Sequence, residues 1–192
     1  MSRVGIFGGT FDPIHNGHLI TAQSVREIRG LDKIIFIPSF VSPHKTDIKS
    51  ADPEHRLAMI KLAIKDISFF ESSDIEIKKS GISYTVETLE AIKKIYPDLE
   101  LIVGYDNIFA IHTWKNPDRI FELAKVLVLK RKSSLPPVFE DKYFHKAIFV
   151  QTRGIEISAT DIRERVKKGL PIHYLVPEKV EKYIFKNKLY QS

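Results

Sequence analysis

Short apolar runs alternate with helically spaced apolar residues along the first part of the chain. Val4–Phe7 and Lys33–Pro38 are short runs that stop at glycine or proline, which is typical of buried parallel strands. Between them, the apolar positions of residues 19–28 recur three or four residues apart, and Gly30 follows as a helix stop signal. The pattern predicts a strand, a helix and a second strand.

The same alternation continues to the end of the chain. Asp52 and Pro53 favour the start of another helix. Further strands are expected at 69–77, 99–103, 126–129 and 147–151, further helices at 84–96, 106–112, 117–123, 160–168 and 177–185, and a polar loop at 132–146. Strands that alternate with helices predict the α/β class, as a single doubly wound, Rossmann-like parallel sheet flanked by helices. We expect one domain over residues 1–192, with a small helical part from about residue 158 to residue 192, and ligands at the carboxyl ends of the strands.

The loop after the first strand, GGTFDPIHNGH over residues 8–18, carries the first chemical signal. Its two glycines let the backbone turn sharply and approach a ligand closely. His15 and His18 stand at the start of a helix, where N–H groups without helical partners bind phosphate. Each imidazole can donate a hydrogen bond to a phosphoryl oxygen without a permanent charge. The alternative is that the histidines are helix caps or metal ligands, with Asp12 as the nearest third ligand.

A second helix start, over residues 157–163, carries the second signal. Ser158 and Asp161 form a variant of the capping box. Arg163 lies in the first turn, where a cation opposes the helix dipole unless an anion offsets it. The segment therefore predicts a second phosphate site, and an exposed surface arginine is the alternative.

The run GIFGGTFDPIHNGHL resembles the signature of the HxGH nucleotidyltransferase superfamily. Within it, the chain is similar to the bacterial nicotinate-mononucleotide adenylyltransferases from Val4 to about Tyr190. The resemblance implies transfer of AMP from ATP to nicotinate mononucleotide, giving deamido-NAD and pyrophosphate in NAD biosynthesis, with Mg²⁺ carried on the ATP. It implies an ATP site made of Gly8, Gly9, Thr10, Phe11, His15, His18, Ile157, Ser158, Thr160 and Arg163. Residues 157–163 resemble the motif I-S-S-T-x-I-R, with Ala159 in place of the second serine.

The resemblance also implies an acceptor site, made of Lys45, Tyr84, Thr85, Gly104, Asp106 and Trp114. Lys45 ends a loop that resembles P-P-H-K, and Ser83–Leu89 resembles S-Y-T-x-D-T-L with Glu87 in place of aspartate. N–H groups near Thr85 would hold the nicotinate carboxylate, Asp106 would contact a ribose hydroxyl, and Trp114 would stack on the pyridine ring. Ordinary helix capping, a solvated lysine and a packing tryptophan are the alternatives.

The same resemblance implies a mechanism with no general base. A phosphate monoester has its second pKa near ~6, so the acceptor phosphate is already a dianionic nucleophile at neutral pH. His18 would stabilise the α-phosphoryl transition state, and His15, Lys45 and Arg163 would hold the phosphates. Arg56 is expected to be structural, and Arg131 receives no role.

Composition narrows the class of protein. The 192 residues include no cysteine, which excludes disulfides, thiolate metal sites and cysteine nucleophiles. No stretch reaches the ~20 continuous apolar residues of a membrane span, and no signal-peptide pattern is present, so we expect a cytoplasmic protein with no membrane partner. The net charge is +6, and residues 130–192 hold 14 Lys and Arg against 7 Asp and Glu. That surplus suits polyanionic small molecules, a solvated surface or nucleic acid.

Three other functions remain open on the sequence. The first is a related enzyme with another acceptor, such as a pantetheine-phosphate adenylyltransferase, a cytidylyltransferase or an enzyme that uses NMN. The second is a nucleic-acid-binding module, although the absence of a base-stacking motif leads us to expect no nucleic-acid partner. The third is a nucleotide sensor without catalysis, which intact His15, His18 and Arg163 disfavour. The pattern leaves open whether the chain is a monomer or a homo-oligomer.

Overall fold

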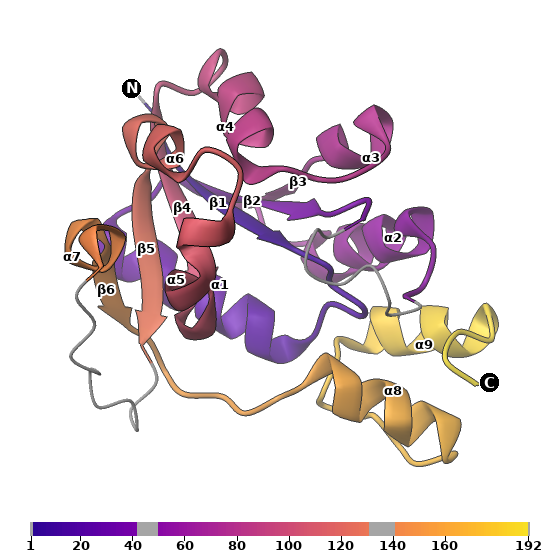
Figure 1. Ribbon diagram of the computed structural model, residues 1–192. Helices are drawn as coiled ribbons and strands as arrows, with labels where there is room; N and C mark the ends of the chain where they lie inside the picture. The colour runs from indigo at the N-terminus through magenta and orange to yellow at the C-terminus, as the bar shows by residue number, and fades with distance from the viewer. Residues whose placement is uncertain (1, 42–49, 131–140, 192) are drawn as a thin grey trace.

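The computed structural model describes residues 2–41, 50–130 and 141–191. Its centre is a parallel sheet of six strands in the order β3-β2-β1-β4-β5-β6 (Figure 1). The strands are β1 (Arg3–Gly9), β2 (Lys33–Pro38), β3 (Phe70–Ser72), β4 (Asp98–Gly104), β5 (Lys125–Lys130) and β6 (Ile148–Gln151). This is the Rossmann order, and it confirms the predicted fold class.

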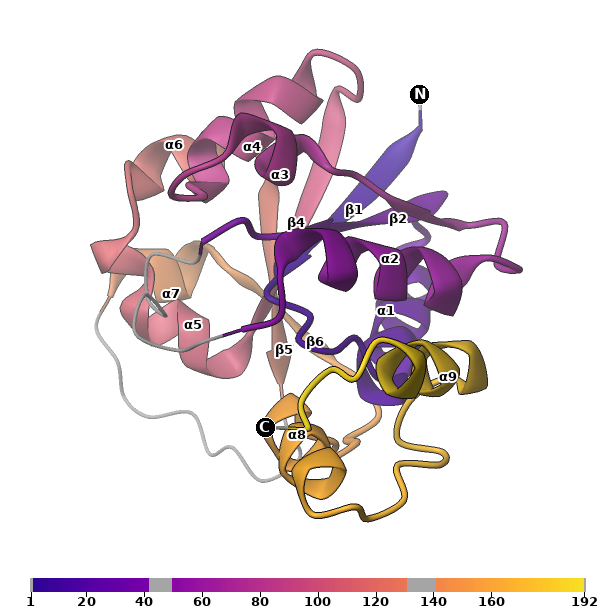
Figure 2. The ribbon, with the colours of Figure 1, turned by 90° about the vertical axis from the view of Figure 1, so that its right-hand side faces the viewer.

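Helices cover both faces of the sheet, as the two views show (Figures 1 and 2). They are α1 (Asn16–Arg29), α2 (Pro53–Ile64), α3 (Ile75–Lys79), α4 (Thr85–Lys93), α5 (Tyr105–Ala110), α6 (Pro117–Leu123), α7 (Lys142–Lys146), α8 (Ala159–Lys167) and α9 (Glu178–Lys186), with a short 3₁₀ turn, η1 (Ile111–Thr113). No helix within these described segments is long and apolar enough to cross a membrane.

Alternate residues of each strand supply two separate cores. Phe7 packs in the core that contains α1, α2, α8 and α9, whereas its neighbour Ile6 packs in the core that contains α4, α5, α6 and α7. Phe36 and Ile37 divide between the two cores in the same way. This alternation follows from the period of two along a strand, and it is why continuous apolar runs mark strands that are buried on both faces.

The predicted strand at 69–77 is wrong in its second half. The strand stops at Ser72, and residues 75–79 form α3. Ser73 begins this change, because its backbone N–H still bonds to the carbonyl oxygen of Phe36 on β2 while its hydroxyl accepts from the N–H of Ile75. Serine and aspartate side chains compete for backbone groups in this manner, and so they favour helix starts over strand interiors.

The predicted loop at 132–146 is also wrong over its last residues. Residues 142–146 form α7, and the carboxylate of Asp141 caps it by accepting from the N–H of Tyr143 at 2.6 Å. The buried ring of Tyr143 stacks against Phe121 of α6. Tertiary packing therefore stabilises a helix that is too short to be stable alone.

The sheet reverses its strand order between β1 and β4. The chain leaves β1 for α1 on one face and leaves β4 for α5 on the other face. Gly8, Gly9 and Gly104 lie at the carboxyl ends of these two strands. A crevice forms at such a point because the two connections diverge, and ligands of doubly wound proteins bind there.

A buried ion pair fixes the C-terminal end of α1 to β4. Glu100 is fully buried in the sheet, and its carboxylate accepts from Nε of Arg29 at 2.8 Å and from Nη2 at 3.1 Å. The Arg29 carbonyl in turn accepts from Nη1 of Arg3 at 2.9 Å. The hydrogen bond to Glu100 raises the pKa of Arg29, so the guanidinium stays charged.

Replacing Arg29 by methionine (Arg29→Met) is expected to lower the free energy of unfolding by about 2–4 kcal/mol, because the buried carboxylate of Glu100 loses both hydrogen bonds from the guanidinium and keeps only Lys125 among the described residues, at 3.9 Å. Urea unfolding measures this change. The control is Arg119→Met, which removes a cation from the exposed pair with Glu122 and should cost less than about 1 kcal/mol. Equal losses in the two variants would contradict the role of the buried pair.

Candidate active site

A cavity of about 430 Å³ opens at the carboxyl ends of β1 and β4. Its lining includes residues from the first loop and α1, from the loop after β2, from α3, from the start of α4, and from the chain between the end of β4 and the residues after η1. The small and polar residues of the lining are Gly8, Gly9, Thr10, His18, Ser39, Glu76, Ser83, Tyr84, Thr85, Thr88, Gly104, Asn107, Thr113, Trp114 and Lys115. Several residues predicted for the ATP side and for the acceptor side thus line one cavity.

The two glycines of the first loop do different work. A side chain at Gly8 would point into open space, because no atom lies within 4 Å of the position of its Cβ. This leaves the backbone open to a ligand, as expected. A Cβ at Gly9 would meet the ring of Phe11 at 3.2 Å. Gly9 therefore makes room for Phe11, which is buried and packs edge-on against the rings of Phe7 and His18.

The imidazoles of His15 and His18 stack with their centroids 3.6 Å apart. The backbone N–H of His15 donates to Nδ1 of His18 at 3.3 Å. Since a neutral imidazole has one donor and one acceptor nitrogen, this bond assigns the proton of neutral His18 to Nε2. His18 lines the cavity. In this tautomer, Nε2 is the ring nitrogen of His18 that can donate to a phosphoryl oxygen.

His15 packs against the ring of His18. Its side chain is buried, and burial lowers its pKa to about 4, so it is neutral at pH 7. It is not among the residues that line the cavity. Its geometry therefore supports the position of the His18 ring, and its predicted contact with phosphate stays a prediction.

The second predicted segment meets the first loop directly. Nη1 of Arg163 donates to the carbonyl oxygen of Asp12 at 2.7 Å, and Nη2 donates to the hydroxyl of Thr160 at 3.3 Å. A Cβ on Gly17 would lie 3.5 Å from Ile157. The start of α8 therefore adjoins the start of α1, although about 140 residues separate them along the chain.

Ser158 occupies the N-cap position of α8, as predicted, but its side chain makes no capping hydrogen bond. Ser158 and Thr160 are both exposed. The hydroxyl groups at this helix start thus face solvent beside the first loop. This placement is suitable for binding the phosphates of a nucleotide.

Asp12 joins three distant parts of the chain. Its Oδ1 accepts from the N–H of Ala51 at 3.1 Å and from the hydroxyl of Tyr190 at 2.7 Å. Its Oδ2 lies 3.7 Å from Nη1 of Arg163. Burial and the negative charge of Asp12 raise the pKa of Tyr190, which keeps the phenol protonated as a donor. The role of Tyr190 was missed in the sequence, because no local pattern connects residue 190 to residue 12.

Arg56 lies under the loops that surround the cavity. The side chain is 1% exposed and donates to four carbonyl oxygens: Ala51 at 2.8 Å, Thr10 at 2.9 Å, Ser39 at 2.6 Å and Phe40 at 3.1 Å. Burial lowers the pKa of Arg56, and the nearby charge of Asp12 opposes that effect. Its contacts are all with the backbone, in agreement with the expected structural role.

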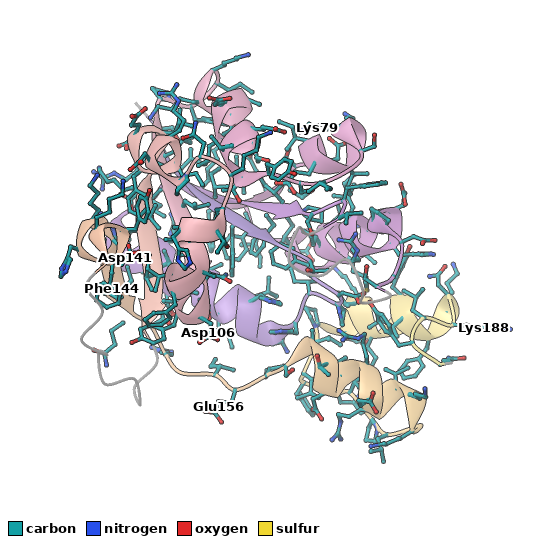
Figure 3. The ribbon with its side chains drawn as sticks, in the orientation of Figure 1. Lys79, Asp106, Asp141, Phe144, Glu156 and Lys188 are labelled. Carbon is teal, nitrogen blue, oxygen red and sulfur yellow. The ribbon has the colours of Figure 1, made fainter. Side chains whose placement is uncertain are left out.

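The acceptor side has a helix start and an aromatic ring. Tyr84 is the N-cap of α4 and Thr85 is its first residue, and both line the cavity with Trp114 and Gly104. Asp106 is exposed in the first turn of α5 (Figure 3). It does not line the cavity, whereas its neighbour Asn107 does. Lys45 and Arg131 lie outside the described residues.

Two charged lining residues were missed in the sequence. Glu76 lies on α3, where a strand was expected, and accepts from the hydroxyl of Thr88 at 2.7 Å. Lys115 follows the predicted Trp114, and its Nζ lies 4.3 Å from the ring centroid of Tyr84. Among the described residues there is no group of three His, Asp or Glu side chains that could hold a metal ion.

A Rossmann-ordered sheet with two adjoining helix starts at its switch point defines a nucleotide-binding α/β protein. Comparison with known proteins narrows this class. Residues 6–165 match the family described as cytidylyltransferase-like. A relative in Bacillus subtilis named nicotinate-nucleotide adenylyltransferase is 40% identical over 194 residues, covering 100% of both chains. A probable nicotinate-nucleotide adenylyltransferase of Thermoanaerobacter is 43% identical over 200 residues, covering 99% of this chain and 95% of its own.

The chain belongs to the cytidylyltransferase-like family and, within it, to the nicotinate-nucleotide adenylyltransferases. Solved structures share its fold. The nicotinic acid mononucleotide adenylyltransferase of Plasmodium falciparum, solved in complex with NaAD, has a TM-score of 0.80 at 19% identity and covers 99% of this chain and 98% of its own. A putative nicotinate-nucleotide adenylyltransferase from Vibrio parahaemolyticus has a TM-score of 0.72 at 23% identity, covering 100% and 97%.

The low pKa of His15 predicts a pH dependence of stability. The unfolded state binds a proton below an ordinary pKa near ~6.5, whereas the folded state does so only below about 4. The stability that the protein gains from neutral His15 is therefore complete above pH 6.5, and it is lost as the pH falls from 6.5 towards 4. His15→Asn, which does not titrate, should flatten the slope of unfolding free energy against pH in that window by up to about 1.4 kcal/mol per pH unit.

Urea unfolding between pH 4.5 and 7.5 measures this slope. His145→Gln, at an exposed histidine of α7, serves as the control and should follow the unmodified protein. If His15→Asn and the unmodified protein gave parallel curves, the buried neutral imidazole would be refuted.

Proposed function

We propose that this protein transfers AMP from ATP to nicotinate mononucleotide, giving deamido-NAD and pyrophosphate. The relatives named nicotinate-nucleotide adenylyltransferase support this activity at about 40% identity over the whole chain. The observation that carries the proposal is the contact of Arg163 with the carbonyl oxygen of Asp12, at 2.7 Å. It brings two phosphate-binding helix starts to one place, as a single triphosphate requires.

The acceptor phosphate supplies the nucleophile. One of its oxygens attacks the α-phosphorus of ATP in line, the new P–O bond forms, and the bond to the bridging oxygen of the β-phosphate breaks as pyrophosphate leaves. The second pKa of a phosphate monoester is near ~6, so this oxygen needs no base at neutral pH. Catalysis then depends on positioning and on neutralising charge.

His18 is the residue that we assign to the reacting phosphorus. The bond from the His15 N–H to Nδ1 leaves the proton on Nε2, which donates to the α-phosphoryl oxygen. The stacked, buried His15 holds that ring, and its low pKa keeps His15 itself uncharged at neutral pH. A neutral donor can be directed at the charge that develops on the phosphate without first removing a charged side chain from water.

The remaining groups of the ATP side bind the nucleotide. Gly8, Gly9 and Thr10 offer the backbone at the end of β1. Arg163, with the exposed Ser158 and Thr160, faces the β- and γ-phosphates from the second helix start. Phe11 belongs to one hydrophobic core, and Ile157 packs against the same core. Lys45 is assigned to the phosphates by the resemblance alone.

Tyr84, Thr85, Gly104 and Trp114 bind the acceptor. The N-terminus of α4 supplies N–H groups and positive potential to a carboxylate, and the ring of Trp114 supplies a flat surface to the pyridine. Asp106 is assigned to a ribose hydroxyl outside the cavity. Mg²⁺ enters with the ATP as part of the substrate.

The proposal includes the organisation and location of the enzyme. We regard residues 1–192 as one domain, because the helical part over 158–192 bonds to the first loop through Arg163, Tyr190 and the carbonyl oxygen of Leu175, which accepts from the N–H of Asn16 at 2.9 Å. We place the enzyme in the cytoplasm, where ATP is supplied.

His18→Ala is expected to lower kcat by about 100–1,000-fold, because it removes a donor to the transition state. Incubation with ATP, Mg²⁺ and nicotinate mononucleotide, followed by chromatography of deamido-NAD and pyrophosphate, measures the rate. Thermal unfolding checks that the variant is folded.

His145→Gln is the matched control and should keep normal turnover. A folded His18→Ala variant with near-normal turnover would refute the role of His18. Product from 4′-phosphopantetheine or a cytidylyl donor, with none from nicotinate mononucleotide, would refute the proposed substrate.

A further inference from the structure

We propose that the side chain of Lys115 selects the acceptor, by favouring a pyridine ring that carries a carboxylate over one that carries a carboxamide. The inference rests on the proposed function and deepens it. Nicotinate mononucleotide and NMN have the same ribose and phosphate and differ only in this group. A residue that separates them must therefore act at the pyridine end of the acceptor site.

Lys115 lies at that end. It lines the cavity beside Trp114, and its Nζ lies 4.3 Å from the ring centroid of Tyr84. A cation over an aromatic face is attracted to the ring, so this contact holds a flexible side chain at the N-terminus of α4. Lys115 is the only lysine or arginine among the lining residues within the described parts of the chain.

The charge of Lys115 is not fully offset by its ion pair. Its Nζ lies 2.6 Å from Oε1 of Glu87, but Lys79 of α3 also pairs with the same carboxylate. Two ammonium groups therefore share one carboxylate, and the three side chains have a net charge of +1. Lys79 is outside the cavity lining and is the last residue of α3 (Figure 3). The unbalanced positive charge thus remains close to the cavity through Lys115.

The positive charge of Lys115 acts against a second carboxyl group in the cavity, that of Glu76. Glu76 lines the same cavity and is held there by its hydrogen bond to Thr88. Burial raises the pKa of Glu76, and in its ionised form this group repels an anionic ligand but not a neutral carboxamide. Positive charge on Lys115, added to that of the α4 N-terminus, offsets this repulsion for the nicotinate group. A neutral carboxamide is stabilised much less than a carboxylate by the same positive potential.

The competing possibility is that Lys115 binds the acceptor phosphate. Both acceptors carry that phosphate, so a phosphate contact would affect them equally. A carboxylate contact would affect nicotinate mononucleotide alone. The ratio of the two acceptors therefore separates the two possibilities.

The test compares kcat/KM for nicotinate mononucleotide and for NMN at saturating Mg·ATP. Lys115→Gln is expected to lower the ratio of the two values about five- to tenfold, through loss on nicotinate mononucleotide, with NMN changed less than twofold. Lys115→Arg should keep the ratio within about threefold. Lys79→Gln is the matched control, since it removes the other cation on Glu87, and it should leave the ratio within twofold.

An unchanged ratio in Lys115→Gln, or an equal loss on both acceptors, would overturn the inference. So would an equal fall of the ratio in Lys79→Gln. Calorimetric binding of the two mononucleotides to the same variants gives a second measure of the ratio that needs no turnover. If the unmodified protein bound both but formed no dinucleotide, the proposed function would fail, and the binding ratio would still decide the role of Lys115.

Discussion

The buried guanidinium of Arg56 is the contact on which the site depends. It binds carbonyl oxygens from the loop after β1, from the loop after β2 and from the segment before α2. Those oxygens belong to backbone that leaves the sheet and has no ladder partners, so a buried donor must satisfy them. Five N–H groups in a rigid plane suit this task, and the compact ammonium of lysine does not. The edge of the cavity is thus fixed by one side chain that never faces the ligand.

Around that support, a neutral imidazole and an arginine meet at the first loop. The buried His15 stacks against His18, while Arg163 donates to the carbonyl oxygen of Asp12. Asp12 offsets part of the arginine charge when no nucleotide is bound. A phosphate that arrives meets a cation already oriented by two hydrogen bonds, and little reorganisation is needed on binding.

The sequence predicts the structural features that local interactions determine. It does not predict the features that depend on tertiary contacts. The alternation of strands and helices, the helix stop at Gly30 and the two helix starts follow from periodicity and from capping residues. The meeting of Arg163 with the first loop followed from resemblance and topology, and the structure confirms it. In contrast, α3 and α7 depend on Ser73, Asp141 and the packing of Tyr143, which override weak local preferences. The contact of Lys115 with Tyr84 lies between residues 31 apart, and no periodic signal links them.

The hydrogen bond from Tyr190 to Asp12 has a consequence for how the protein is made. Residue 12 precedes residue 190 by 178 positions, so a nascent chain has the strand and both histidines long before it has the group that holds their loop. Domains generally fold as units as they are synthesised. The geometry of the first loop can therefore mature only after the segment that carries Tyr190 has been synthesised.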